Sequence, residues 1–219
     1  MALHNFLILM INAQRIRSLP YCGVVVDLGC GNSSYKDDIV KKSQQYIGVD
    51  WPNCQHNQKS IDIFADLNLY LPFRTNRVDT VVSFEVLEHL SEPQSFLHEA
   101  CRILKPGGQL FVSVPFQWQI HEAPYDCYRY TKYGLEYILK KSGFSDIVIT
   151  SKTGFWLTWF LKFNYHSLRF IKGPMFVRWL IRAMLIPVWI INQLAGTVLD
   201  KFDRDESETA GYTARAVKR

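Results

Sequence analysis

The spacing of apolar and polar residues changes repeatedly along this chain. Short apolar runs rich in β-branched residues alternate with longer segments whose apolar residues recur at helical spacing. The first such run, Val24-Val25-Val26, is typical of a strand buried on both faces of a parallel sheet. We expect strands at 23–28, 45–50, 60–64, 79–84, 109–115 and 145–151, and helices at about 34–43, 92–104 and 131–142. This alternation predicts an α/β fold with a doubly wound, parallel sheet.

A turn containing two glycines follows the first predicted strand. Asp27 ends the strand, and Gly29 and Gly31 allow a sharp turn and a close approach of the backbone to a ligand. The carboxylate can accept hydrogen bonds from a cationic or polar ligand. A dinucleotide site would have a third glycine where Ser34 stands, and an acid two residues before the first glycine suits a phosphate poorly. The loop therefore predicts a nucleotide-like cofactor site of another kind.

Five segments, in order, resemble the motifs of one enzyme family. They are Asp27-Leu28-Gly29-Cys30-Gly31, Tyr46 to Trp51, Ala65-Asp66-Leu67, Asp79 to Leu90, and Leu104 to Gly108 with the run that ends at Pro115. Together they resemble class I S-adenosylmethionine-dependent methyltransferases, most of all the methyltransferase type 11 group that includes the ubiquinone-biosynthesis methyltransferases. The chain departs from that pattern at Ser33, where the family often has another glycine.

The resemblance implies a Rossmann-like sheet, mostly parallel, with an antiparallel last strand at Gly211–Val217 and helices on both faces. It implies S-adenosylmethionine as the cofactor, with Asp27 and the two glycines at its methionine end. Asp50 would bind the ribose, Trp51 would cover the adenine, and Asp66 and Leu67 would contact it. The cofactor-binding residues expected in this way are Asp27, Gly29, Gly31, Asp50, Trp51, Asp66, Leu67 and Phe84.

The loop after the fifth strand is the expected acceptor site, because strand ends in open α/β sheets face the ligand crevice. His121 is the candidate general base, although it could instead bond the substrate or support the loop. Asp126 is assigned to catalysis with it, and could position His121 or pair with Arg129. Tyr125 and Arg129 are the candidate substrate-binding residues. Thr131 is expected to cap the following helix, whereas His89 and Asp79 are expected to be structural.

Composition is typical of one reduced, intracellular domain. The chain has 219 residues, a net charge of +5 and five cysteines without a C-x-x-C pair, which favours free thiols in the cytoplasm and argues against structural zinc. Cys54 and His56 alone do not make a metal site, so we assign no metal ligands. The apolar run Phe6–Ile11 is too short to span a bilayer and makes a poor signal peptide, so we expect a short helix there.

Residues 152–199 differ in composition from the rest of the chain. They contain no Asp or Glu, four of the six tryptophans, and six basic residues: Lys152, Lys162, Arg169, Lys172, Arg178 and Arg182. Thr158, Lys162, His166, Arg169 and Lys172 recur at helical spacing and predict one polar stripe. We therefore expect a single methyltransferase domain over 1–219 with an amphipathic helical insertion at 152–205, whose second helix breaks at Pro187.

Wide apolar faces with tryptophan and basic residues favour helices that lie in a membrane interface. A lid or subunit interface is the alternative, and charges, Pro187 and two amides argue against a span. Nucleic acid is not an expected partner, because the many aliphatic residues of this segment would contribute little to binding it. The combined prediction is O-methylation of a small or lipid-linked acceptor at the inner face of the cytoplasmic membrane. An NAD-dependent oxidoreductase and a non-catalytic membrane-associated module are the alternatives; the sequence specifies neither the acceptor nor the oligomeric state.

Overall fold

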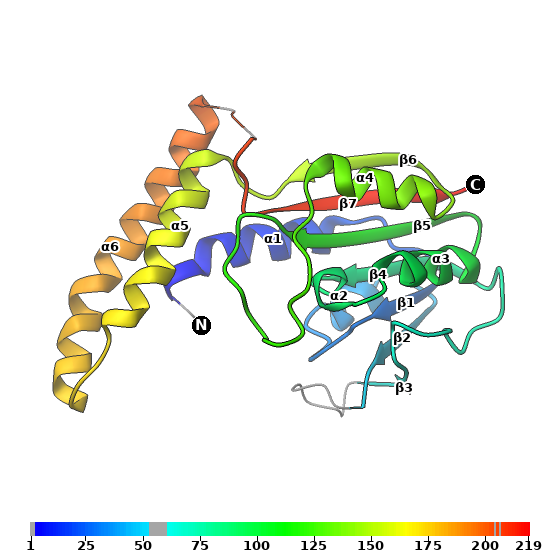
Figure 1. Ribbon diagram of the computed structural model, residues 1–219, viewed down its shortest axis with the longest axis horizontal. Coiled ribbons are helices and arrows are strands. Elements are labelled where there is room, and N and C mark those ends of the chain that lie inside the picture. Colours follow the sequence, from blue (N-terminus) through cyan, green and yellow to red (C-terminus); the bar gives the residue numbers. More distant parts are fainter. Residues whose placement is uncertain (1–2, 53–60, 204, 206) are drawn as a thin grey trace. The chain divides into compact units, whose positions relative to one another are not determined.

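The computed structural model describes residues 3–52, 61–203, 205 and 207–219 (Figure 1). Cys54 and His56 therefore lie outside the described residues. The chain forms two compact units. One consists of Arg17–Thr150 with Gly211–Arg219, and the other of Ser151–Ala210 with the segment that ends at Ile16. The insertion predicted at 152–205 lies within the second of these units, and each unit is described by itself below.

The first unit is built on a seven-stranded sheet of order β3-β2-β1-β4-β5-β7-β6. The strands are β1 (Val24–Leu28), β2 (Gln45–Asp50), β3 (Ile63–Phe64), β4 (Val78–Phe84), β5 (Leu104–Pro115), β6 (Phe144–Ser151) and β7 (Gly211–Lys218). The pairs β1–β2, β1–β4, β2–β3 and β4–β5 are parallel, and β7 pairs antiparallel with β5. The doubly wound, mostly parallel sheet with an antiparallel last strand is thus confirmed.

Among the described residues, four helical segments connect these strands: α2 (Lys36–Val40), η3 (Leu87–His89), α3 (Pro93–Ile103) and α4 (Lys132–Lys141). Thr131 caps α4 as expected, because its Oγ1 accepts a hydrogen bond from the amide of Gly134 at 3.0 Å. Helix α2 is shorter than predicted, since the amide of Gln44 donates to the carbonyl of Gly23 at 2.8 Å and leads the chain into β2.

Residues 105–108 form an irregularity inside β5. Val78 of β4 pairs with Leu104, but Thr80 pairs with Gln109, so four residues of β5 leave the regular ladder. Gly107 adopts a φ of 78°, which a glycine accommodates without strain. The strand therefore begins five residues before the predicted start at 109.

The apolar core lies on both faces of the sheet, as the valine run predicts. Val26 and Leu28 belong to a large cluster on one face, and Val25 belongs to a smaller cluster with Ile39 and Phe111. All three side chains are fully buried. Because successive side chains of a strand point to opposite faces, a continuous apolar run is required where both faces are covered.

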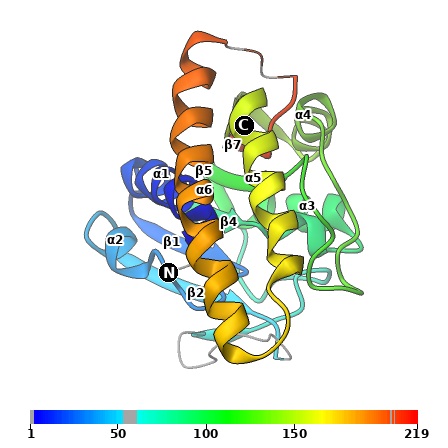
Figure 2. The same ribbon diagram turned by 90° about the vertical axis from the view of Figure 1, so that its left-hand side faces the viewer.

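The second unit is helical. It contains η1 (Leu3–Asn5), most of α1 (Phe6–Ser18), α5 (Phe155–Ser167), η4 (Leu168–Phe170) and α6 (Met175–Phe202). Figures 1 and 2 show α5 and α6 side by side and antiparallel, as a hairpin. The short helix expected at Phe6–Ile11 is present and extends to Ser18.

The expected break at Pro187 was wrong, because α6 runs through it as one helix of 28 residues. A proline removes one backbone donor, and the hydrogen bonds of the turns on either side still hold a long helix together. Among the described residues, α6 is also the one helix that is long and apolar enough to cross a membrane by length and composition alone. Pro187 therefore no longer argues against a membrane span of this segment, whereas its charges and its two amides still do.

Candidate active site

The glycine turn after β1 is held by backbone hydrogen bonds to β2. The amides of Gly29 and Cys30 both donate to the carbonyl of Val49, at 2.8 and 3.1 Å. Gly29 has a φ of 81°, and a Cβ there would lie 2.3 Å from Cγ2 of Val86. Glycine is thus required at 29 both by backbone conformation and by space.

Ser33 occupies the place where the related enzymes often have a glycine, and it adopts the glycine-like conformation, with a φ of 50°. Its amide donates to the carbonyl of Cys30 at 2.7 Å, and its Oγ lies at hydrogen-bond distance, 3.2 Å, from the hydroxyl oxygen of Tyr46. These two bonds keep the loop in its tight turn although residue 33 carries a side chain.

Asp50 joins the end of β2 to the glycine turn. Its Oδ2 accepts a hydrogen bond from the amide of Gly31 at 2.7 Å, and its Oδ1 accepts one from the amide of Trp51 at 2.8 Å. The side chain is buried. A carboxylate in this position fixes the loop geometry, and its remaining lone pairs can accept hydroxyl groups of a ligand.

Asp27 is buried beneath the turn, where the hydroxyl of Tyr46 donates to its Oδ2 at 2.7 Å. Burial raises the pKa of Asp27 to about 7; the bond from Tyr46 opposes this shift and the charge of Asp50 adds to it. Tyr46 was missed by the sequence analysis. Its signal was strand periodicity, since residues 46, 48 and 50 share one face of β2 and Gly48 pairs with Asp27.

This raised pKa has a consequence for stability. Between pH ~4 and ~7 the folded state holds a proton on Asp27 that the unfolded chain has lost, so stability falls as pH rises through this window. We expect Asp27→Asn, which retains an acceptor for Tyr46, to remove that part of the decline, on the order of 3 kcal/mol between pH 5 and pH 8. Urea unfolding of both proteins at pH 5 and pH 8 measures it, with Asp37→Asn on α2 as a control. Equal declines in wild type and Asp27→Asn would contradict the assignment.

The remaining residues of the expected cofactor site lie at or after strand ends. Asp66 is exposed, and its Oδ1 accepts a hydrogen bond from the amide of Asn68 at 2.9 Å. The Leu67 side chain is buried in the large core cluster. Phe84 ends β4 and packs in the smaller cluster, with its ring 5.8 Å from that of Tyr35. Cofactor contacts of these three residues remain predictions.

The loop expected to bind the acceptor is fastened to η3, at the exit of β4. The amides of Cys127 and Tyr128 donate to the carbonyl of Glu88 at 2.8 and 3.1 Å. The hydroxyl of Tyr130 donates to the carbonyl of Leu87 at 3.1 Å. The exits of β4 and β5 are therefore held together, and a ligand at one is within reach of the loop that follows the other.

Asp126 organises this loop. Arg129 contacts both of its carboxylate oxygens, at 2.5 and 2.7 Å, and the amide of His121 donates to its Oδ2 at 2.8 Å. The bonds from Arg129 hold the pKa of Asp126 well below its usual range, although its burial opposes them. Both alternatives considered from the sequence are thus present: Asp126 pairs with Arg129 and also positions His121. A carboxylate whose pKa is lowered in this way is a weak base, which favours a positioning role for Asp126.

Arg129 is largely occupied by the loop itself. Besides the ion pair, its Nη2 donates to the carbonyl of Gln119 at 2.8 Å and its Nη1 to the carbonyl of Tyr128 at 2.8 Å. Its assignment to substrate binding remains a prediction. The observed bonds show Arg129 stabilising the loop that presents His121.

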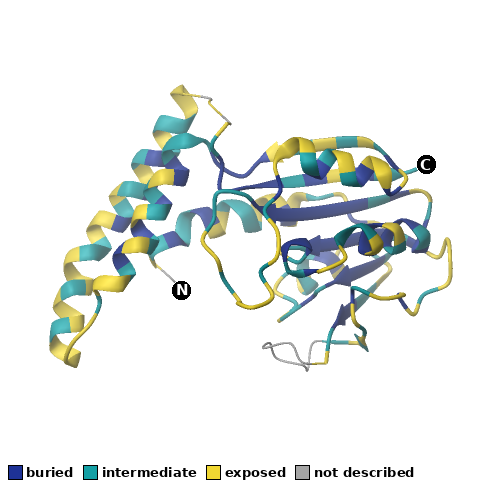
Figure 3. Cartoon of the chain, in the orientation of Figure 1, coloured by how far each residue is buried: buried dark blue, intermediate teal, exposed yellow. Residues whose placement is uncertain are grey.

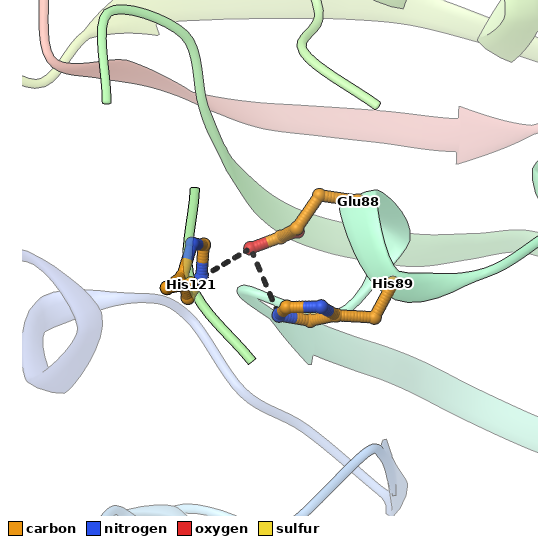
Figure 4. A group of neighbouring side chains, drawn as sticks. All are labelled: Glu88, His89 and His121. Carbon is orange, nitrogen blue, oxygen red and sulfur yellow. Dashed lines mark ion pairs between the residues drawn. The ribbon is translucent and has the colours of Figure 1, made fainter. Parts of the chain in front are cut away.

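His121 belongs to a cluster with Glu88 and His89, drawn in Figure 4. Oε1 of the fully buried Glu88 lies 3.7 Å from Nε2 of His89 and 3.9 Å from Nε2 of His121. One ligand atom from each residue lies within 4.8 Å of the other two. Two imidazoles and a carboxylate are ligands suited to a divalent transition metal. The sequence alone does not reveal this cluster, because His121 lies far from Glu88 and His89 in the chain and approaches them only in the folded protein.

One ring contact connects the two halves of the site. Trp51, expected to cover the adenine, lies edge to face against Tyr125 of the acceptor loop, with the ring centroids 5.3 Å apart. The glycine turn, Asp50, η3 and the acceptor loop all follow the carboxyl ends of β1, β2, β4 and β5. Ligands bind at that end in open α/β sheets. The fold and the site together have the arrangement that the resemblance to class I methyltransferases implies.

Comparisons with known proteins agree with this arrangement of fold and site. Residues 26–112 match a family described as "Methyltransferase domain". A probable S-adenosylmethionine-dependent methyltransferase of Mycolicibacterium smegmatis is 33% identical over 96 residues, which cover 42% of this chain and 37% of that protein. The match thus spans less than two fifths of that relative's length. A ubiquinone biosynthesis O-methyltransferase of Dechloromonas aromatica is 23% identical over 210 residues, covering 89% of this chain and 78% of that protein.

The fold has counterparts among solved structures. A SAM-dependent methyltransferase from Archaeoglobus fulgidus superposes with a TM-score of 0.61 at 18% identity, covering 98% of this chain and 94% of that one. The family match over residues 26–112 and the named methyltransferase relatives confirm the resemblance to class I S-adenosylmethionine-dependent methyltransferases, and the solved structure agrees with the fold. S-adenosylmethionine is the cofactor of that class.

Proposed function

We propose that this protein transfers a methyl group from S-adenosylmethionine to a hydroxyl of a small or lipid-linked acceptor, at the inner face of the cytoplasmic membrane. The observation that supports this most is the contact between Trp51 and Tyr125. It brings the expected adenine cover against the loop that carries His121, so that cofactor and acceptor would meet above the carboxyl ends of the same strands.

Methyl transfer is an in-line displacement. A lone pair of the acceptor oxygen attacks the methyl carbon, the carbon–sulfur bond breaks, and its electron pair neutralises the sulfonium. The acceptor proton leaves to a base, for which His121 is the candidate. The bond from the His121 amide to Asp126 fixes the backbone of this residue, so the imidazole is held in place before substrate arrives.

Two observations support a membrane location and an oxygen acceptor. The α5–α6 hairpin carries exposed apolar and basic side chains together, which suits a lipid interface. The relative from Dechloromonas aromatica is named a ubiquinone biosynthesis O-methyltransferase, a name that specifies oxygen as the methylated atom in that protein.

Binding experiments test the cofactor assignment against the alternatives. We expect calorimetric titration of the purified full chain to show saturable binding of S-adenosylmethionine and no measurable heat with NAD. Binding of NAD alone would favour the oxidoreductase, and binding of neither would favour a non-catalytic module. Transfer of label from methyl-labelled S-adenosylmethionine into a lipid extract then tests the acceptor class, with a water-soluble phenol as the comparison substrate.

A further inference from the structure

The helical hairpin has a polar interior. Asn164, Gln193 and Thr158 are fully buried within this helical unit. The Nδ2 of Asn164 donates to the carbonyl of Trp189 at 3.2 Å, and Nε2 of Gln193 donates to the carbonyl of Leu3 at 2.9 Å. Thr158, the first residue of the expected polar stripe, is buried, with its hydroxyl 2.7 Å from the carbonyl of Gly154 and 2.7 Å from Oγ1 of Thr153.

Small and hydrogen-bonded residues bring the two helices together. A Cβ at Gly196 of α6 would lie 2.7 Å from Cα of Leu157 of α5, so only glycine permits this approach. The indole of Trp189 donates to Oγ of Ser167 at 2.7 Å. Close backbone contact and interhelical hydrogen bonds are how helices associate where the hydrophobic effect contributes little.

The outside of the hairpin is apolar instead. Figure 3 shows exposed residues along both helices. On α6 the large exposed apolar side chains include Met175, Phe176, Trp179, Leu180, Met184, Ile191, Leu194, Val198 and Phe202. Phe176 and Trp179 are each 67% exposed. An apolar surface of this extent marks an interaction site.

Charge divides the hairpin into two ends. We name residues 168–184 the tip and residues 197–203 the base. The tip carries Arg169, Lys172, Arg178 and Arg182 and no acid. The base carries Asp200 and Asp203, and Oδ2 of Asp200 accepts a hydrogen bond from the amide of Gly154 at 2.8 Å. Apolar side chains occur at both ends, but only the tip combines them with excess positive charge.

We propose that the tip docks this protein on an anionic lipid bilayer, with Phe176 and Trp179 in the interface and the four cations among the head groups. The inference rests on the membrane location in the proposed function and adds the surface that makes contact. Interfacial helices combine basic residues with aromatic and aliphatic side chains in this way, and each cation near an anionic surface strengthens binding.

The same charges distinguish this arrangement from two others. The chain enters the hairpin from the sheet unit and returns to it afterwards. A spanning α6 would therefore carry the four tip cations across the bilayer, which is costly. A symmetric dimer through the tip would place the cations of one copy against those of the other, because residues 152–199 contain no acid.

Matched variants at the two ends test the proposal in the full chain. We expect Arg178→Glu/Arg182→Glu to weaken co-sedimentation with phosphatidylcholine–phosphatidylglycerol vesicles at low salt at least ~10-fold, and Lys201→Glu at the base to change it less than ~2-fold. Phe176→Ser should weaken binding about 10-fold at low and high salt alike, whereas Phe202→Ser, 85% exposed at the base, should not. Far-UV circular dichroism confirms that each variant keeps its helices.

Equal losses from tip and base variants, or no binding of the wild type to these vesicles, would overturn the proposal. Conversion of a dimer to a monomer by the tip variants, seen by light scattering without vesicle binding, would identify the tip as a subunit interface instead. Calorimetry with S-adenosylmethionine separates this outcome from the proposed methyl transfer. Tip variants should bind the cofactor as the wild type does, and a chain that bound vesicles but no cofactor would contradict methyl transfer alone.

Discussion

His121→Ala should lower kcat roughly 10²–10⁴-fold while leaving the affinity for S-adenosylmethionine nearly unchanged. The imidazole lies on the acceptor loop, with Nδ1 3.4 Å from Oδ2 of Asp126 and Nε2 facing Glu88. Its removal takes away the candidate base, and the glycine turn and Asp50 are untouched. Turnover is measured by transfer of a labelled methyl group, and cofactor affinity by calorimetry.

His98→Ala provides the matched control. His98 lies on α3 and its Nε2 is 3.3 Å from the carbonyl of Lys141, outside the cluster. We expect this variant to retain wild-type turnover. A fully active His121→Ala enzyme would assign proton removal to another group, or show that the acceptor reacts without a base. Loss of cofactor binding in His121→Ala would instead mean that the loop holds the cofactor.

Local sequence patterns predicted the sheet well, because the residues of each strand indicate that strand almost without reference to the rest of the chain. Val24-Val25-Val26 faces apolar neighbours on both sides, so continuous hydrophobicity reports burial directly. The cap at Thr131 and the end of α4 before Gly143, which has a φ of 94°, likewise depend on a few adjacent residues. The antiparallel direction of the last strand followed from the family resemblance rather than from any local pattern.

The features that were missed depend on residues far apart in the chain. Tyr46 reaches Asp27 across two neighbouring strands, and His121 meets Glu88 through the docking of a loop on η3. In the hairpin, periodicity grouped Thr158 with the polar stripe of α5, but it did not show that Thr158 is buried. A sequence shows which side chains share a face of a helix, but not whether that face meets water, lipid or another helix.

Asp50→Ala should weaken binding of S-adenosylmethionine by roughly 1.5–3 kcal/mol, or about 10–150-fold in Kd, as expected for loss of a charged acceptor. The structure gives this loss two sources. The carboxylate is the candidate ribose ligand, and it also accepts the amides of Gly31 and Trp51, so its removal loosens the turn that would cradle the cofactor. Calorimetric titration of the folded variant measures the change.

Asp62→Ala is the control for this experiment, because it separates cofactor binding from general support of β2. Oδ2 of Asp62 accepts a hydrogen bond from the amide of Gly48 at 2.7 Å, so this carboxylate also bonds a backbone amide near the glycine turn. It is not among the expected cofactor ligands, and we expect Asp62→Ala to change Kd less than about 2-fold. Asp50→Asn retains one acceptor for a backbone amide and should fall between the two. Unchanged affinity in a folded Asp50→Ala protein would rule out Asp50 as the ribose ligand, since neither of its two roles would then contribute to binding.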